Sequence, residues 1–302
     1  MKRILIVYNP NSSRFIDVEK EVLIPIKDYK GYLVGKYEVE KTNIEANVAK
    51  LSKLIQDDDL VISAGGDATG IIASNAIIKS KKDATLAVLP YGNFNDLSRT
   101  LGTKTLSDVL DQKPTRKKLY PLEIIVDGKF FRYATCYVTI GMTAEAVELF
   151  DNPKTRKKLQ KGHKSSWRSY FYLMAWYFKN RHKKQFIPEF TINGQTTAKK
   201  ISDYCALSGK SMCRVMKGGD DYLKPKVFQS ENCRLTNLWR LIKLMTAAIF
   251  VRTPGKPTTG DTLEFTKPAT VELQAEGEYK VFKDIKKIEI KKSDHFIKVI
   301  HK

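Results

Sequence analysis

The 302-residue chain has no long hydrophobic run. Its longest apolar stretches, such as Leu244 to Val251, fall well short of the roughly 18 residues that a membrane-spanning helix requires. The N-terminal apolar run is also short, because it ends at Asn9-Pro10, and it predicts a first strand rather than a signal peptide. No export is implied, and we expect a cytoplasmic protein.

Cysteine and histidine are scarce, with four residues of each. The histidines are scattered, and no Cys-x-x-Cys spacing occurs among the four cysteines, which are Cys136, Cys205, Cys213 and Cys233. This distribution lacks any recognisable zinc pattern, so we expect buried, reduced thiols. The sequence also has no internal repeat and no low-complexity tract.

Acidic residues are in deficit, since 33 Asp and Glu stand against 53 Lys and Arg, a formal net charge of +20. Such an excess predicts attraction to an anionic partner, which could be nucleic acid, a phosphorylated ligand or an acidic membrane surface. The length exceeds that of one ordinary domain and predicts two, each able to bury its own core.

Strand and helix patterns alternate over the first domain, which we place at residues 1–120. Apolar runs predict strands at 3–8, 59–63 and 85–92, and helical spacing predicts helices at 42–55 and 71–79. We expect Thr42 and Glu45 to form a capping box at the start of the first of these helices. The alternation predicts a Rossmann-like parallel sheet with helices on both faces.

Short alternating segments with turn residues between them follow in the second domain, which we place at 121–302. An Asp127-Gly128 pair between two apolar runs is a strong hairpin signal. Further strands are predicted at 189–193, 201–209, 261–274 and 280–292. We therefore expect an antiparallel β-sandwich, with the extreme C-terminus able to pack back on the first domain.

Three polar loops follow the predicted parallel strands. They are Tyr8 to Arg14, Gly65-Gly66-Asp67, and Pro90 to Gly102. Ligands of open α/β sheets bind at the carboxyl edge of the strands, and a glycine pair before a helix lets backbone N–H groups approach an anion. Asp67 would hold Mg²⁺ that bridges phosphate oxygens or would orient a hydroxyl group. Helix capping by Asp67 is the structural alternative.

The three loops resemble, in order and approximate spacing, the signatures of the diacylglycerol kinase catalytic family, which includes sphingosine and ceramide kinases. The family's Asn-Pro, Gly-Gly-Asp-Gly-Thr and Pro-x-Gly-Thr-x-Asn-Asp motifs correspond to residues 9–13, 65–69 and 90–96. Residues 140–147 and 217–225 resemble glycine-containing segments of the family's β-domain. The resemblance implies a phosphofructokinase-type nucleotide-binding domain, a lipid-substrate β-sandwich, and ATP bound between them.

The resemblance also implies which residues form the site. Asp67 would serve the reacting groups and the metal, and Arg99 would balance phosphate charge. The nucleotide-binding residues would be Asn9, Ser12, Ser13, Thr42, Gly65, Gly66, Thr69, Gly92, Asn95, Asp96 and Arg99.

The family's late Asp-Gly-Glu signature, whose Asp is the proposed general base for the lipid hydroxyl, reads Glu276-Gly277-Glu278 here. Glu276 and Glu278 are therefore candidate catalytic residues. The carboxylate of Glu276 sits about one methylene further from the backbone than an Asp would, and proton transfer depends first on reach. A solvated Glu-Gly-Glu turn is the alternative.

Other positions depart from the family pattern. Ala68 replaces a glycine, Ile72 a glutamate and Asn93 a threonine. A methyl group at Ala68 is tolerable unless the residue needs a positive φ. In the region where bacterial members carry a structural magnesium site, only Glu231 keeps an acid. The chain is thus similar to a divergent member of the family.

A basic, aromatic segment runs from Lys154 to Lys184, with eleven Lys or Arg residues and no acid. Aromatic rings flanked by cations suit an anionic membrane interface, where each basic residue adds about 1 kcal/mol. A helix that packs its rings on the sandwich and exposes a basic flank is the alternative.

Three functions are consistent with these patterns. The first is a kinase that uses ATP and Mg²⁺ to phosphorylate a hydroxyl of diacylglycerol or a related lipid, with the enzyme bound peripherally to an anionic membrane. The second is a catalytically weakened relative that binds lipid or nucleotide. The third, nucleic-acid binding through charge, has no recognised motif to support it, so no nucleic acid is expected. A homodimer is compatible with the sequence.

Overall fold

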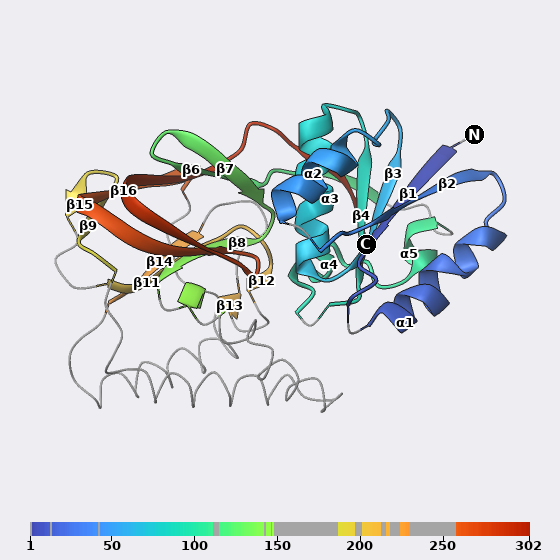
Figure 1. Ribbon diagram of the computed structural model, residues 1–302, viewed down its shortest axis with the longest axis horizontal. Coiled ribbons are helices and arrows are strands. Elements are labelled where there is room, and N and C mark those ends of the chain that lie inside the picture. The colour runs from blue at the N-terminus through green and yellow to red at the C-terminus, as the bar shows by residue number, and fades with distance from the viewer. Residues whose placement is uncertain are drawn as a thin grey trace.

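The computed structural model describes residues 2–12, 14–41, 43–92, 94–110, 115–141, 143–145, 147, 187–196, 201–212, 216–217, 224–229 and 258–302. These residues form two sheets that lie one after the other along the long axis (Figure 1). The segment from Lys154 to Lys184 and the residues Ser13, Thr42, Asn93 and Glu231 lie outside the described residues.

Six strands of the described chain form the first sheet, in the order β2-β1-β3-β4-β17-β5. The first five are parallel, and β5 runs antiparallel to β17. Their bounds are β1 (Lys2–Tyr8), β2 (Tyr32–Glu38), β3 (Leu60–Gly65), β4 (Thr85–Pro90), β5 (Thr115–Leu119) and β17 (Ile297–His301).

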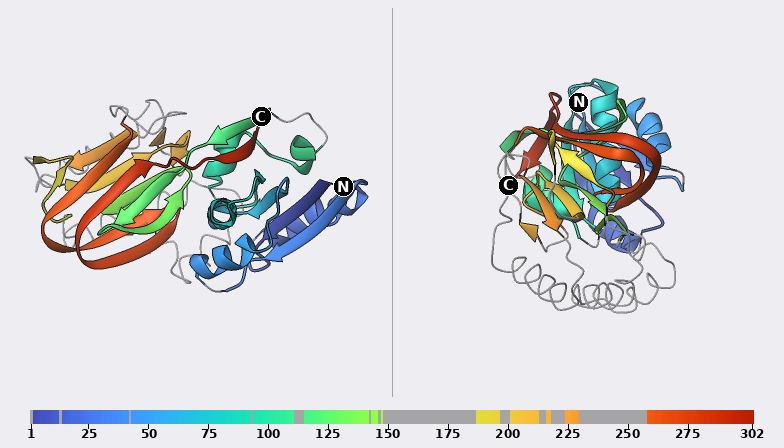
Figure 2. Two further views of the ribbon diagram at one scale, coloured as in Figure 1. Left: turned by 90° about the horizontal axis from the view of Figure 1, so that it is seen from above. Right: turned by 90° about the vertical axis from the view of Figure 1, so that its left-hand side faces the viewer.

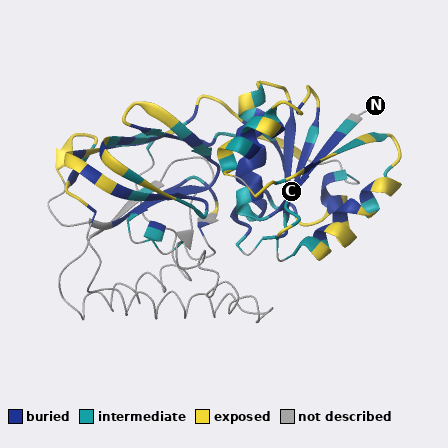
Figure 3. Ribbon diagram, viewed as in Figure 1, coloured by how far each residue is buried: buried dark blue, intermediate teal, exposed yellow. Residues whose placement is uncertain are grey.

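Helices cover both faces of this sheet, as predicted, because successive strand residues point to opposite sides. Leu5 and Val7 of β1 pack with α2 (Ile44–Ser52), α3 (Asp67–Ser80) and α4 (Asp96–Leu101). Ile4 and Ile6 pack on the other face, whose helices are α1 (Phe15–Val18), η1 (Glu19–Leu23), η2 (Pro25–Asp28) and α5 (Leu106–Leu110). Figure 3 shows the central strands buried.

The following features of this half differ from the sequence predictions, which also contained no strand at β5. Strand β2 was not predicted, because it lies at the sheet edge and leaves residues such as Leu33 exposed (59%), so no continuous apolar run marks it. Helix α3 begins at Asp67 rather than at Ile71. The predicted capping box is wrong, because Asn43 is the N-cap of α2 and its side chain accepts a hydrogen bond from the Ala46 N–H (2.7 Å).

Within the described ranges, nine strands form the second sheet. Its main path is β14-β11-β8-β15-β16-β6-β7, with β9 paired to β15 and β10 paired to β9, all antiparallel. The bounds are β6 (Leu122–Val126), β7 (Lys129–Ala134), β8 (Tyr137–Gly141), β9 (Phe190–Ile192), β10 (Gln195–Thr196), β11 (Ile201–Leu207), β14 (Lys224–Gln229), β15 (Gly260–Ala275) and β16 (Glu278–Lys292). A small ribbon pairs β12 (Ser211–Met212) with β13 (Met216–Lys217).

The second sheet curls around its own core (Figure 2), which gathers buried residues such as Ile124, Val138, Tyr204 and Leu273. The pairing of β15 with β16 shifts register between Glu264 and Val271. The predicted hairpin between β6 and β7 is confirmed, and Asp127 (φ 47°) and Gly128 (φ 75°) both adopt the left-handed conformation of a tight turn.

The predicted fold class, an α/β parallel-sheet half followed by an antiparallel β half, is confirmed. After β16 the chain leaves the second sheet, and β17 pairs with β4 and β5 in the first sheet. The domain boundaries at 120 and 121 stay a prediction.

The described cysteines and helices agree with the expectations from composition. Cys136 and Cys205 are buried free thiols, as predicted, and Cys213 and Cys233 lie outside the described residues. None of the helices that the structure describes is long and apolar enough to cross a membrane.

Candidate functional site

The carboxyl ends of four parallel strands meet at one edge of the first sheet. The register places Tyr8 beside Glu38 and beside Ala64, and it places Gly65 beside Pro90. The three loops singled out in the sequence therefore start side by side, together with the loop between β2 and α2. This is the edge at which α/β sheets bind their ligands.

Gly66 and Gly92 allow two of these loops to touch through their backbones. A Cβ on Gly92 would lie 2.4 Å from the Cα of Gly66, so no side chain fits there. A Cβ on Gly65 would lie 2.4 Å from the Oγ1 of Thr69, whose buried side chain (3% exposed) fills that space. Ala68 lies in helical backbone without a positive φ, so its methyl group is tolerated.

Asp67 joins the second loop to the third. Its Oδ2 accepts a hydrogen bond from the Asn95 N–H (3.1 Å), and its Oδ1 accepts one from the Asp96 N–H (2.8 Å). Asp67 thus satisfies the first N–H groups of the neighbouring helix α4 rather than capping its own helix. Burial and the nearby charge of Asp96 raise the pKa of Asp67 to about 6, although the two N–H groups and Arg99 oppose the shift.

Asn95 and Asp96 are both buried at the start of α4. The Asn95 carboxamide closes the third loop, because Oδ1 accepts from the Gly92 N–H (2.7 Å) and Nδ2 donates to the Gly92 carbonyl (2.8 Å). The guanidinium of Arg99 forms an ion pair with the Asp96 carboxylate. The charge of Arg99, which was expected to balance phosphate, is therefore paired with a carboxylate of the protein itself.

Glu276 lies in the two-residue turn between β15 and β16. Glu276 (φ 52°) and Gly277 (φ 92°) are both left-handed, and Ala275 pairs with Glu278 across the turn. The alternative of a solvated turn is wrong, because Glu276 is only 4% exposed. Glu278 is partly exposed at the start of β16.

The Glu276 carboxylate is held by the corner between β7 and β8. The Thr135 hydroxyl donates to Oε1 (2.7 Å) and lies 3.0 Å from Oε2, and the Cys136 N–H also donates to Oε1. Burial raises the pKa of Glu276 to about 7, and the charge of Asp67 adds to the increase while the two donors oppose it. The same corner contacts α4, the helix whose first N–H groups bind Asp67, because the Sγ of Cys136 lies 3.8 Å from the Oγ1 of Thr100.

The first loop is tied to the third by Arg14. Its Nη1 donates to the Pro90 carbonyl (2.9 Å), and its guanidinium lies 5.4 Å from the ring centroid of Tyr91. Within the loop, the side chain of Asn9 accepts a hydrogen bond from the Asn11 N–H (2.9 Å), and the buried hydroxyl of Ser12 has no partner in the described part of the chain. The expected residue Ser13 lies outside the described residues.

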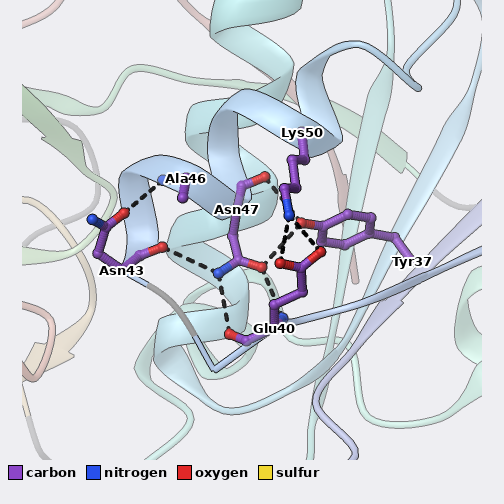
Figure 4. A network of polar contacts seen from close by, with 6 residues as sticks. All are labelled: Tyr37, Glu40, Asn43, Ala46, Asn47 and Lys50. Atoms are coloured by element: carbon purple, nitrogen blue, oxygen red, sulfur yellow. Dashed lines mark hydrogen bonds and ion pairs between the residues drawn. The ribbon is translucent and has the colours of Figure 1, made fainter.

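A network around Asn47 holds the loop between β2 and α2 (Figure 4). The buried Asn47 side chain accepts from the Glu40 N–H (2.9 Å) and the Tyr37 hydroxyl (3.0 Å), and it donates to the Glu40 and Asn43 carbonyls. Lys50 pairs with the Glu40 carboxylate. Thr42, expected to touch the nucleotide, belongs to this loop but lies outside the described residues.

Sequence reasoning missed Arg14, Asn47 and Thr135. The Arg14 contact joins residues 76 apart, and the Thr135 contact joins residues 141 apart, so neither leaves a local signal. Asn47 could have been found, because a polar residue on the apolar side of a predicted helix is unusual.

The donor set limits how a metal could be held. Among the described residues, no group of three or more His, Cys, Asp or Glu side chains is arranged to hold a metal ion. Burial is the main cause of the raised pKa values of Asp67 and Glu276, and a neighbouring carboxylate adds to each, so a bound cation would stabilise their ionised forms. Such a site fits Mg²⁺ bound by one or two carboxylates with its other ligands from phosphate and water.

The whole chain has the fold of a diacylglycerol kinase. It superposes on a crystal structure of a diacylglycerol kinase from Bacillus anthracis str. Sterne with a TM-score of 0.65 and 14% identity, covering 100% of this chain and 97% of that chain. Because the identity is low, this likeness establishes the fold alone.

Sequence comparison agrees with this likeness over the first part of the chain. Residues 3–125 match the diacylglycerol kinase catalytic domain, which confirms the predicted resemblance over this segment. The chain is 34% identical over 136 residues to a diacylglycerol kinase of Bacillus subtilis (43% of this chain, 44% of that protein). It is 32% identical over 129 residues to one of Staphylococcus epidermidis (42% and 37%). The matches thus span less than half the length of these curated relatives.

Proposed function

We propose that the protein is a lipid kinase that transfers the γ-phosphate of ATP to a hydroxyl of diacylglycerol or a related lipid. The observation that carries this proposal is the contact between α4, whose first N–H groups bind Asp67, and the β7–β8 corner, which holds Glu276. There the Oγ1 of Thr100 lies 3.8 Å from the Sγ of Cys136. Phosphoryl transfer depends mainly on positioning and charge neutralisation. This edge offers the positioning, and bound Mg²⁺ would supply the neutralisation.

The proposed roles follow from where each group lies. Backbone N–H groups of the loops after β1, β3 and β4 would bind the phosphates, and bound Mg²⁺ would neutralise charge near Asp67. Glu276 would accept the proton of the lipid hydroxyl, because its pKa of about 7 lies near neutrality. The membrane surface that supplies the lipid and a homodimeric state belong to the same proposal.

A second function is favoured by one specific observation. Arg99 pairs with Asp96, and both oxygens of Asp67 accept backbone hydrogen bonds, so these groups already have structural roles. A relative that binds nucleotide or lipid without turnover would use such a site.

Incubation of the protein with labelled ATP, Mg²⁺ and mixed micelles of candidate lipids separates the two functions. A kinase yields labelled lipid, and Glu276→Gln reduces the yield strongly while leaving nucleotide affinity unchanged. Nucleotide binding without labelling of any hydroxyl lipid would contradict the kinase and support the binding protein.

A further inference from the structure

The carboxamide of Asn75 connects the two sheets directly. Asn75 lies in α3, is buried (7% exposed), and faces the backbone of Tyr133 in β7. Its Oδ1 accepts from the Tyr133 N–H (3.0 Å), and its Nδ2 donates to the Tyr133 carbonyl (3.0 Å) and to the Ile71 carbonyl (2.9 Å).

This pair of bonds replaces a missing neighbouring strand. Strand β7 is the last strand on the main path of the second sheet, as far as the structure describes it, so one side of its backbone lacks a ladder partner. The Asn75 amide offers one donor and one acceptor, as an adjacent strand would. Helix α3 is thereby fixed to Tyr133 at the β7 edge. Figure 1 shows α3 beside the end of β7.

The contact between Asn75 and Tyr133 lies between the two candidate catalytic carboxylates. Helix α3 connects Asn75 to Asp67, and the end of β7 connects Tyr133 to the residues that hold Glu276. Asp67 begins α3, eight residues or about 12 Å along the axis from Asn75. Two residues beyond Tyr133, Thr135 and then Cys136 hold the Glu276 carboxylate.

We infer that Asn75 is a positioning residue that sets the placement of Glu276 relative to Asp67 during lipid phosphorylation. The expected effect on catalysis rests on the proposed function, whereas the link between Asn75 and the Glu276 corner can be tested without it. A second link between the sheets is the ion pair of Arg132 with Glu45. The Arg132 side chain is 10% exposed but the Glu45 side chain is 53% exposed, so solvent screens one end of this pair. The buried Asn75 amide is the stronger constraint.

The first test is kinetic. Asn75→Ala should lower kcat for lipid phosphorylation at least tenfold while the KM for ATP changes less than twofold, because the loops that would bind the nucleotide keep their contacts. Asn75→Asp should lower kcat as much, because it keeps the acceptor for the Tyr133 N–H but places an oxygen against the Tyr133 and Ile71 carbonyls. Glu45→Gln should have a small effect.

Asn193→Ala is the matched control. The Asn193 carboxamide also makes two bonds, since it donates to the Asp261 carboxylate (3.0 Å) and accepts from the Thr262 N–H (2.8 Å). Asn193 is exposed, and its partners lie at the start of β15, at the other end of that strand from Glu276. We expect it to lose stability while retaining kcat. An Asn75→Ala enzyme with the kcat of the unmodified protein would overturn the inference.

Hydrogen exchange separates this inference from the proposed function. The Tyr133 N–H is bonded to Asn75 and the Cys136 N–H to Glu276, so both should exchange faster in Asn75→Ala but not in Asn193→Ala. If no lipid is phosphorylated but this pattern appears, the kinase proposal fails and the positional link stands. If Cys136 keeps its protection in Asn75→Ala, the link is refuted whatever the activity.

Discussion

Replacing Thr135 with Val tests whether Glu276 is a base whose pKa is set by the β7–β8 corner. The Thr135 hydroxyl is fully buried and donates to the Glu276 carboxylate at 2.7 Å. Valine has nearly the same shape but no donor, so the change removes one hydrogen bond from the ionised form. The pKa of Glu276, already raised to about 7 by burial, should rise further.

The size of the effect follows from the strength of the lost bond. A hydrogen bond to a charged group is worth about 1.5–3 kcal/mol. Since each pKa unit corresponds to about 1.4 kcal/mol, the pKa should rise by about one to two units. At pH 7 the ionised fraction of Glu276 would fall about 5- to 50-fold, and the rate of lipid phosphorylation should fall with it.

The assay is the pH dependence of kcat/KM between pH 5.5 and pH 9.5. The acidic limb should move to higher pH in Thr135→Val, and most of the rate should return at the alkaline end. Thr139→Val is the control, because the Thr139 hydroxyl is equally buried but has no hydrogen-bond partner among the residues that the structure describes. An acidic limb at the same pH in both variants would refute the role assigned to Thr135 and Glu276.

Three further outcomes are expected. Asp67→Asn should abolish lipid phosphorylation and lower the free energy of unfolding by about 1–3 kcal/mol, measured by urea denaturation, because an amide cannot accept both N–H groups of α4. Gly92→Ala should lower the free energy of unfolding by about 1–3 kcal/mol, because its Cβ would clash with Gly66. Gly66→Ala should lower it less, because its Cβ would lie 3.3 Å from Gly92. Equal decreases in melting temperature for the two variants would contradict this packing argument. The folded-state pKa values of Asp67 and Glu276 are raised, so their contribution to the free energy of unfolding is fully present below about pH 4 and is lost as the pH rises towards 7. Glu276→Gln should make this decline smaller, which urea titrations at pH 5 and pH 8 would measure.

Local patterns determined much of this protein. The apolar run before Asn9 and the run before Gly65 each predicted a buried parallel strand, because a strand covered on both faces has few polar positions. The Asp127-Gly128 pair predicted a hairpin, since few other residues adopt two successive left-handed conformations. Loop order and spacing also predicted the family whose catalytic-domain model residues 3–125 match.

Only the tertiary structure decided what the site residues contact. The sequence showed Asp67 after a glycine pair, but its partners are the N–H groups of Asn95 and Asp96, nearly thirty residues away. It showed Glu276 in a turn where solvent exposure was an open alternative, and the corner at Thr135 buries it. Strand periodicity depends on neighbours one or two positions apart and is readable locally, whereas a carboxylate's pKa depends on charges and donors that folding brings from distant segments.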